Sequence, residues 1–131
     1  MINYKDDKNI SVVQIKDLFS SVGWKTGENP DKLLTSLKNS ESLITAWDEN
    51  RLVGLVNAFS DATMVVYMHY VLTHHDYQNK GIGRQMINGI LKKYQDYKHL
   101  VLISNNGKLG FFQKCGFNIC EGATAMEIRK R

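Results

Sequence analysis

The stretch VLTHHDYQNKGIGR, residues 71–84, joins the end of an apolar, strand-like run to the start of a helix. Helices usually begin with Asp or Glu, because the helix macrodipole is positive at that end. This one begins with Lys80 and Arg84 and has no acidic residue among its first positions. Gly81 and Gly83 leave the backbone N–H groups open to close approach. The pattern predicts a site for an anion such as phosphate; the structural alternative is a glycine-rich turn before an amphipathic helix.

Two well-known phosphate loops do not fit this stretch. A Walker loop needs Gly-Lys-Ser/Thr, which is absent, and the dinucleotide fingerprint needs a third glycine where Met86 stands. The remaining pattern, Gln78-x-x-Gly81-x-Gly83, resembles the pyrophosphate loop of the GNAT superfamily of N-acetyltransferases, Gln/Arg-x-x-Gly-x-Gly/Ala. A second segment, residues 105–117, contains Phe-Phe-Gln-Lys-Cys-Gly-Phe and resembles the family's Phe-Tyr-x-Lys-x-Gly-Phe.

Length and composition describe one globular domain, residues 1–131, with 43% apolar residues. No apolar run approaches the roughly 20 residues of a membrane span, and residues 1–7 lack the apolar region of a signal peptide. We therefore expect a cytoplasmic protein without a membrane partner. The net charge of +4 comes from basic residues scattered among acids, which suits a phosphate-bearing ligand and does not favour nucleic acid.

The cysteines and loop histidines do not predict a metal site. Cys115 and Cys120 are five residues apart, which fits neither a zinc motif nor a redox motif, so reduced thiols are expected. His74, His75 and Asp76 are adjacent in a loop and lack the spacing of metal ligands.

Hydrophobic periodicity and turn residues predict a mixed central sheet flanked by helices, an α/β (α+β) fold. The predicted strands are residues 2–7, 43–47, 52–59, 63–72, 100–103, 117–121 and 125–129, and the predicted helices are 10–22, 30–40, 82–94 and 108–115. The long run 63–72 and the strand 100–103 should form a parallel pair joined by a right-handed crossover. Apart from the number of final strands, this order is that of the GNAT fold.

The resemblance implies an N-acetyltransferase that moves an acetyl group from acetyl-CoA directly to a primary amine of a small molecule or peptide. It implies that backbone groups of Val71, Leu72 and Thr73 pair with the pantetheine arm, and that the N–H of Leu72 or Thr73 stabilises the oxyanion. By the same resemblance, the side chain of Asn105 bonds that arm. The pyrophosphate would meet the loop formed by Gln78, Asn79, Lys80, Gly81, Ile82, Gly83 and Arg84.

The general base is less defined by sequence. Strict alternation along the strand gives one face with Tyr67, His69 and Val71 and another with Met68, Tyr70 and Leu72. Of these side chains, His69 alone has an ordinary pKa near neutrality, so it is the candidate base, with a purely structural histidine as the alternative. Trp24 follows the first helix where the family has its acceptor pocket, and Tyr67 would face the same cavity; a core position is the alternative for Trp24.

Phe112 departs from the family pattern. The family often has a tyrosine there that protonates the departing thiolate, and phenylalanine cannot donate a proton. Phe112 could instead pack on the pantetheine arm. The departure keeps a second function open, a non-catalytic module that binds acetyl-CoA or CoA as a sensor or scaffold. A homodimer is also left open.

Overall fold

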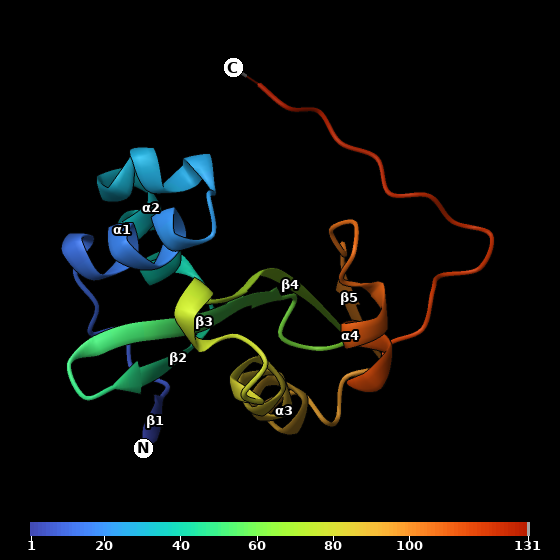
Figure 1. Ribbon diagram of the computed structural model, residues 1–131. Helices are drawn as coiled ribbons and strands as arrows, with labels where there is room; N and C mark the ends of the chain where they lie inside the picture. The colour runs from blue at the N-terminus through green and yellow to red at the C-terminus, as the bar shows by residue number, and fades with distance from the viewer. Residues whose placement is uncertain (131) are drawn as a thin grey trace.

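The computed structural model describes residues 1–130, which form a five-stranded sheet with helices on both faces (Figure 1). The strands are β1 (Ile2–Lys5), β2 (Ser42–Asp48), β3 (Arg51–Ser60), β4 (Val65–Thr73) and β5 (His99–Leu102). The α-helices are α1 (Val12–Ser21), α2 (Pro30–Asn39), α3 (Ile82–Lys93) and α4 (Leu109–Lys114), and two 3₁₀ turns are η1 (Lys25–Glu28) and η2 (His75–Tyr77).

The sheet has the order β1-β2-β3-β4-β5. The first four strands form an antiparallel meander, and β5 lies parallel to β4. The parallel pair is joined through α3, as the crossover from residues 63–72 to 100–103 predicted. The mixed sheet flanked by helices confirms the predicted fold class.

Local sequence accounts for the helix ends. Ser11 caps α1 in a capping box with Gln14, and Gly23 follows the helix with a φ of 73°. Pro30 opens α2 with a fixed φ that suits the first turn. Gly81 precedes α3 in the left-handed conformation, with a φ of 80°.

Two apolar clusters fill the spaces above and below the sheet. Figure 1 shows α1 and α2 on one side of the sheet and α3 on the other. Gly89 lets α3 approach β2, since a Cβ there would lie 2.7 Å from the Cδ1 of Ile44. The C-terminal end of α3 is fixed by the hydroxyl of Tyr94, which donates to Glu41 Oε1 at 2.6 Å and hydrogen-bonds Ser42. Burial and the bond to Glu41 raise the pKa of Tyr94 to about 12.

Two predictions about β-structure are wrong. Residues 117–121 and 125–129 are not strands in the described chain: Phe117 packs on the core, and residues 118–130 form an exposed tail that pairs with no sheet edge. Strict alternation along β4 also fails, because the register with β3 shifts between Val56 and Ala58 and leaves two β4 residues, His69 and Tyr70, opposite one. Met68 therefore belongs to the α3 side, whereas Tyr70 and Leu72 belong to the α1 side and Val71 returns to the α3 side.

The bulge is held by a buried amide. Asn57 is fully buried; its Oδ1 accepts the backbone N–H of Tyr70 at 2.7 Å, and its Nδ2 donates to Ser40 Oγ at 3.0 Å. The side chain thus replaces the backbone partner that Tyr70 loses at the bulge.

None of the helices in residues 1–130 is both long and apolar enough to cross a bilayer.

The role of Asn57 can be tested by stability. Asn57→Ala should lower the free energy of unfolding by about 1–3 kcal/mol, because it leaves the buried N–H of Tyr70 without an acceptor. Urea unfolding followed by fluorescence measures this change. The control is Asn88→Ala on the exposed face of α3, where we expect a change within about 0.5 kcal/mol. Equal effects of the two substitutions would contradict a special role for Asn57.

Candidate functional site

The candidate site begins where β4 and β5 separate. β5 pairs with β4 only from Val65 to Met68, whereas β3 pairs with β4 as far as Thr73. Residues 69–73 therefore have backbone groups on the β5 side that no strand of the described chain uses. The separation begins at the bulge, because the extra residue bends the strand and increases its twist.

The alternation of backbone N–H groups decides which residues face this opening. The N–H of Tyr70 bonds Asn57 on β3, and the N–H of His74 bonds the Val53 carbonyl, also on β3, at 2.8 Å. Since successive N–H groups of a strand point to opposite sides, the N–H of Leu72 is directed toward β3 and those of Val71 and Thr73 toward the opening. Of the two predicted oxyanion donors, only Thr73 has its N–H on the open side.

The loop between β4 and α3 has the backbone shape of an anion site. Asn79 and Gly81 both adopt left-handed conformations, with φ of 64° and 80°, which turns neighbouring N–H groups inward. The first intrahelical bond runs from Gln85 N–H to the Gly81 carbonyl, so the amides of residues 82–84 have no helical partner. The first turn of α3 contains no acidic residue.

Two contacts attach this loop to the opening. Gln78 Nε2 donates to the carbonyl of Thr73 at 3.2 Å, which links the loop to the end of β4. At Gly83, a Cβ would lie 3.2 Å from Phe111 Cζ and 3.5 Å from Thr73 Oγ1. Gly83 thus allows α3, β4 and α4 to converge, and the absence of a side chain leaves its amide accessible from outside.

The other residues predicted to bind the donor differ in burial and in their contacts. Ile82 is buried in the core and contributes only its backbone to the loop. The ammonium of Lys80 lies 5.4 Å from the centre of the Tyr77 ring, and Arg84 is exposed on α3. Asn105 is exposed in the loop after β5, where its carbonyl accepts the Lys108 N–H at 3.1 Å. These features fit a ligand bearing phosphates, with two cations at its edge.

Phe112 is buried in the α3-side core, with its ring in edge contact with Phe111 and Phe117. Phe111, its neighbour, is only partly buried and is the residue that meets Gly83. The structure therefore brings Phe111, rather than Phe112, to the junction of the loop and the opening.

A row of aromatic rings lies on the α1 side of the bulge. The Trp24 ring centre is 5.9 Å from those of Phe19 and Tyr70, and the His69 ring centre is 4.1 Å from Tyr70 and 5.8 Å from Tyr67. The bulge brings His69 and Tyr70 side by side. Of the predicted pocket residues, Tyr67 contacts the candidate base directly, and Trp24 is connected to it through Tyr70.

The environment of His69 favours the neutral imidazole. His69 is exposed, but the neighbouring aromatic rings displace part of its water, and this desolvation lowers the pKa of His69 from its ordinary value of 6.5 because it disfavours the charged form. The ring consequently stays neutral, and able to accept a proton, to a lower pH than a free histidine.

A network of His74, Arg51 and Asp17 holds the η2 turn that leads into the anion loop. His74 is 4% exposed; its Nδ1 accepts the Asp76 N–H at 3.1 Å, and its Nε2 lies 2.8 Å from Arg51 Nη2. Arg51 in turn bonds Asp17 on α1 at 3.2 Å. These contacts hold η2 against α1 and β3. No group of three metal-ligating side chains occurs within residues 1–130.

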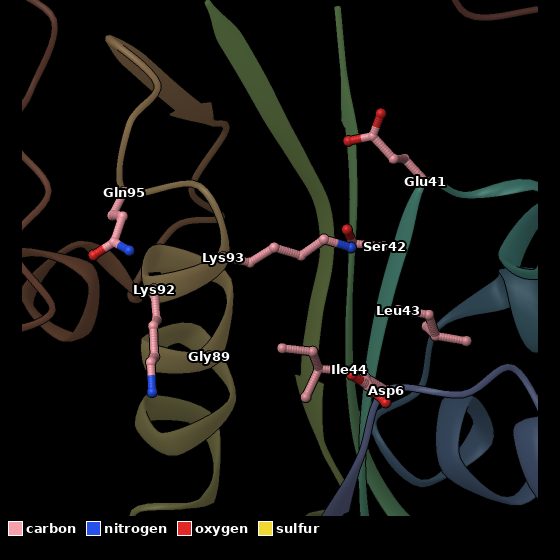
Figure 2. A pocket seen from close by; sticks show the side chains of 9 residues that line it. All are labelled: Asp6, Glu41, Ser42, Leu43, Ile44, Gly89, Lys92, Lys93 and Gln95. Atoms are coloured by element: carbon pink, nitrogen blue, oxygen red, sulfur yellow. The ribbon is translucent and has the colours of Figure 1, made fainter. Parts of the chain in front are cut away.

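A separate cavity of about 520 Å³ lies at the other end of α3 (Figure 2). It is lined by Asp6, Glu41, Ser42, Leu43, Ile44, Gly89, Lys92, Lys93 and Gln95. Figure 2 shows Lys93 reaching from α3 toward Ser42 on β2. Hydrogen bonds from Ser60 and Tyr94 lower the pKa of Glu41, with a smaller contribution from Lys93. Gly89 is eight residues beyond Gly81, about 12 Å along the helix, so this cleft is distinct from the anion loop.

Comparison with known proteins identifies the family and agrees with the fold. The chain belongs to the GNAT acetyltransferase family, whose model matches residues 10–117. It is 31% identical over 128 residues to an uncharacterized N-acetyltransferase, ycf52, of Pyropia yezoensis, covering 88% of this chain and 72% of that protein. The chain spans between 55% and 66% of the length of four further curated relatives, so it matches only part of each of them.

Solved structures share the architecture. A GNAT-family acetyltransferase from Streptococcus pneumoniae superposes with a TM-score of 0.82 and 24% identity, covering 100% of this chain and 99% of that one. The aminoglycoside acetyltransferase AAC(6')-Iy, solved with a CoA bisubstrate analogue, has a TM-score of 0.73 and 12% identity, with coverage of 100% and 99%. The chain is accordingly an acetyltransferase of the GNAT fold, and GNAT enzymes generally use acetyl-CoA.

Sequence reasoning missed Asn57, Tyr70 and Phe111. A buried Asn in an apolar strand was a signal for Asn57, since strand interiors disfavour Asn unless its amide is bonded. Strict alternation grouped Tyr70 with Met68 and away from His69, so its place beside His69 was missed. Phe111 was overlooked because the family motif drew attention to the next residue.

The anion loop can be tested with an isosteric charge. Asn79→Asp keeps the left-handed backbone, which both residues tolerate, and places a carboxylate beside the expected pyrophosphate. We expect the acetyl-CoA dissociation constant to rise at least tenfold, about 1.4 kcal/mol, in isothermal titration. Thermal stability should be unchanged or slightly higher, because the charge suits the helix N-terminus.

Asn88→Asp serves as the control, because it adds the same charge on the exposed face of α3, the helix that follows the loop. It should leave the dissociation constant within about twofold, since long-range repulsion between exposed charges is screened at physiological salt. If both variants weaken binding equally, the phosphates do not lie at this loop.

Proposed function

We propose that this domain transfers an acetyl group from acetyl-CoA to a primary amine of a small molecule or peptide. The observation that carries the proposal is the opening of β4 beside an amide-rich loop with no acidic residue in the following helical turn. One arrangement thereby offers both strand-edge groups for an extended arm and an anion site for its phosphates.

Donor binding is proposed to rest mainly on the backbone. The N–H and C=O groups of Val71 and the N–H of Thr73 suit an extended pantetheine chain, and the amides of residues 82–84 suit the pyrophosphate. Asn105 and Phe111 border the same region from the β5 and α4 side. Acetyl-CoA supplies the activated acyl group as a thioester. Aminoglycoside acetyltransferase AAC(6')-Iy, which shares the fold, was solved with a CoA bisubstrate analogue, which supports this assignment.

The transfer we propose is direct. The amine nitrogen attacks the thioester carbonyl carbon, a C–N bond forms, and the C–S bond breaks with its electron pair leaving on sulfur. The N–H of Thr73 is the preferred donor to the developing oxyanion, because it points to the opening. The proton released by the amine passes to His69, directly or through water. Phe112 cannot protonate the thiolate, so that proton comes from solvent or another group.

The acceptor is proposed to enter over the ring row of Trp24, Tyr70, His69 and Tyr67. Aromatic faces attract cations, so a protonated amine can be held there before it loses its proton. Both a small amine and the amino group of a peptide satisfy this chemistry.

Turnover with a panel of small amines and short peptides tests the function. We expect release of free CoA thiol that depends on the amine, together with an acetylated product detected by mass spectrometry. Tight acetyl-CoA binding without release of CoA for any amine would overturn the enzymatic proposal and favour the binding module.

His69→Gln tests the base. The substitution should lower kcat by about 10² while the acetyl-CoA dissociation constant stays unchanged. It should also remove from the pH–rate profile an acid limb whose midpoint lies below 6.5, since the pKa of His69 is lowered. His99→Gln, at the far end of the β4–β5 pairing, is the matched control and should leave both the rate and the profile unchanged. A loss of less than threefold at every pH would assign the base elsewhere.

A further inference from the structure

The departing sulfur atom of CoA needs a proton that Phe112 does not supply. In the transfer proposed above, the amine releases one proton to His69, and the sulfur leaves the acetyl carbon with an electron pair. The reaction balances within the site when that proton ends on sulfur. A donor positioned beside the opening of β4 would deliver it faster than bulk water.

Four of the six tyrosines are excluded as this donor by their contacts or positions. The hydroxyls of Tyr77 and Tyr94 already donate to carboxylates. Tyr97 packs against Tyr94 at the C-terminal end of α3, far from the opening. Tyr4 is on β1, at the other edge of the sheet. The remaining two tyrosines both belong to β4 and to its row of rings.

These two tyrosines of β4 differ in their relation to the opening. Tyr67 pairs with Phe59 on β3 and with Val101 on β5, so it belongs to the closed part of the sheet. Tyr70 lies beyond Met68, the last residue of β4 that pairs with β5. Tyr70 is therefore the tyrosine of the open segment, where the thioester of an extended pantetheine arm would lie.

Tyr70 is held firmly, but its hydroxyl is free. Its N–H bonds Asn57 at 2.7 Å, and its ring meets Phe19 edge-on with the ring centres 5.2 Å apart. The hydroxyl forms no hydrogen bond with any group that the structure describes. No buried polar side-chain atom of the described residues lacks a partner, so this unpaired hydroxyl reaches solvent. A ring fixed by packing with a free, accessible O–H is suited to proton donation.

We propose that Tyr70 is the catalytic acid that protonates the departing CoA sulfur, and that His69 returns the proton to it. This assignment rests on the proposed function. As the C–S bond breaks and its electron pair moves to sulfur, the Tyr70 O–H gives its proton to that sulfur. The tyrosinate then takes the proton that His69 removed from the amine, directly or through one water, since the two ring centres are 4.1 Å apart. The amine proton thus ends on the thiol, and both residues return to their starting states.

The charged groups near the Tyr70 phenol favour this circuit. Desolvation lowers the pKa of His69, so its imidazolium gives up the proton readily. In the C-terminal tail, the pKa of Arg129 is raised mainly by its hydrogen bond to Glu127 and slightly by the charge of Tyr70. Both the imidazolium and the guanidinium are cations, and nearby cations stabilise the transient tyrosinate.

Tyr70→Phe tests the assignment, because it removes the hydroxyl and keeps the ring. With acetyl-CoA and the best substrate of the amine panel, we expect kcat to fall at least tenfold. The KM for the amine and the acetyl-CoA dissociation constant should stay within about threefold, since the ring row and the backbone are unchanged. Tyr4→Phe removes the same hydroxyl from β1 and is the control, with kcat unchanged.

Fluorinated tyrosines at position 70 separate a proton donor from a structural ring. Each added ring fluorine makes the phenol more acidic at nearly constant size. A general acid must be protonated, so the rate is lost as pH rises through its ionisation. The basic limb of the pH–rate profile should therefore move to lower pH with each fluorine at position 70, and should stay in place when the same series replaces Tyr67.

The outcomes distinguish this assignment from the proposed function. If the wild type turns over and Tyr70→Phe keeps its kcat, the acid is His69 or solvent, and the assignment fails while the reaction stands. A basic limb that follows the fluorines at position 67 would assign the acid to Tyr67 and also overturn it. A wild type that releases no CoA with any amine would overturn the proposed function and this assignment together.

Discussion

The hydrogen bond from the Tyr70 N–H to the side chain of Asn57 supports the rest of this structure. It lets β4 carry one residue more than β3 across the same length without leaving a buried donor unpaired. Beyond that point the strand changes which residues face each helical layer and separates from β5. The opening, the directions of the Val71 and Thr73 amides, and the contact between His69 and Tyr70 all follow from this one irregularity.

The anion loop is shaped by contacts on both of its sides. Before it, His74 and Arg51 hold the turn against α1 and β3; behind it, Ile82 is anchored in the core. The loop itself offers mostly backbone amides, which need no particular side chains to bind an anion. Recognition of phosphate is therefore compatible with variable loop residues, provided that the left-handed positions at Asn79 and Gly81 are kept.

The sequence predicted the elements whose signals are local. Hydrophobic periodicity and turn residues identified the helices, and the loop motif with Gly81 and Gly83 identified the family. The faces of β4 could not be read in the same way, because the bulge depends on Asn57, which is distant in sequence. The tail was predicted as two strands since its pattern is that of a strand, but pairing requires an edge, which pattern alone does not identify.

The short pairing between β4 and β5 divides the domain into two units of unequal local stability. The β2–β4 part of the meander is joined through seven and six residue pairs, whereas β5 is attached through four residue pairs and through the contacts of α4 with the core. Such a unit can open without global unfolding, so its amides should exchange with deuterium before those of the meander. A ligand lying between β4 and β5 would bind only the closed form and would therefore slow that exchange.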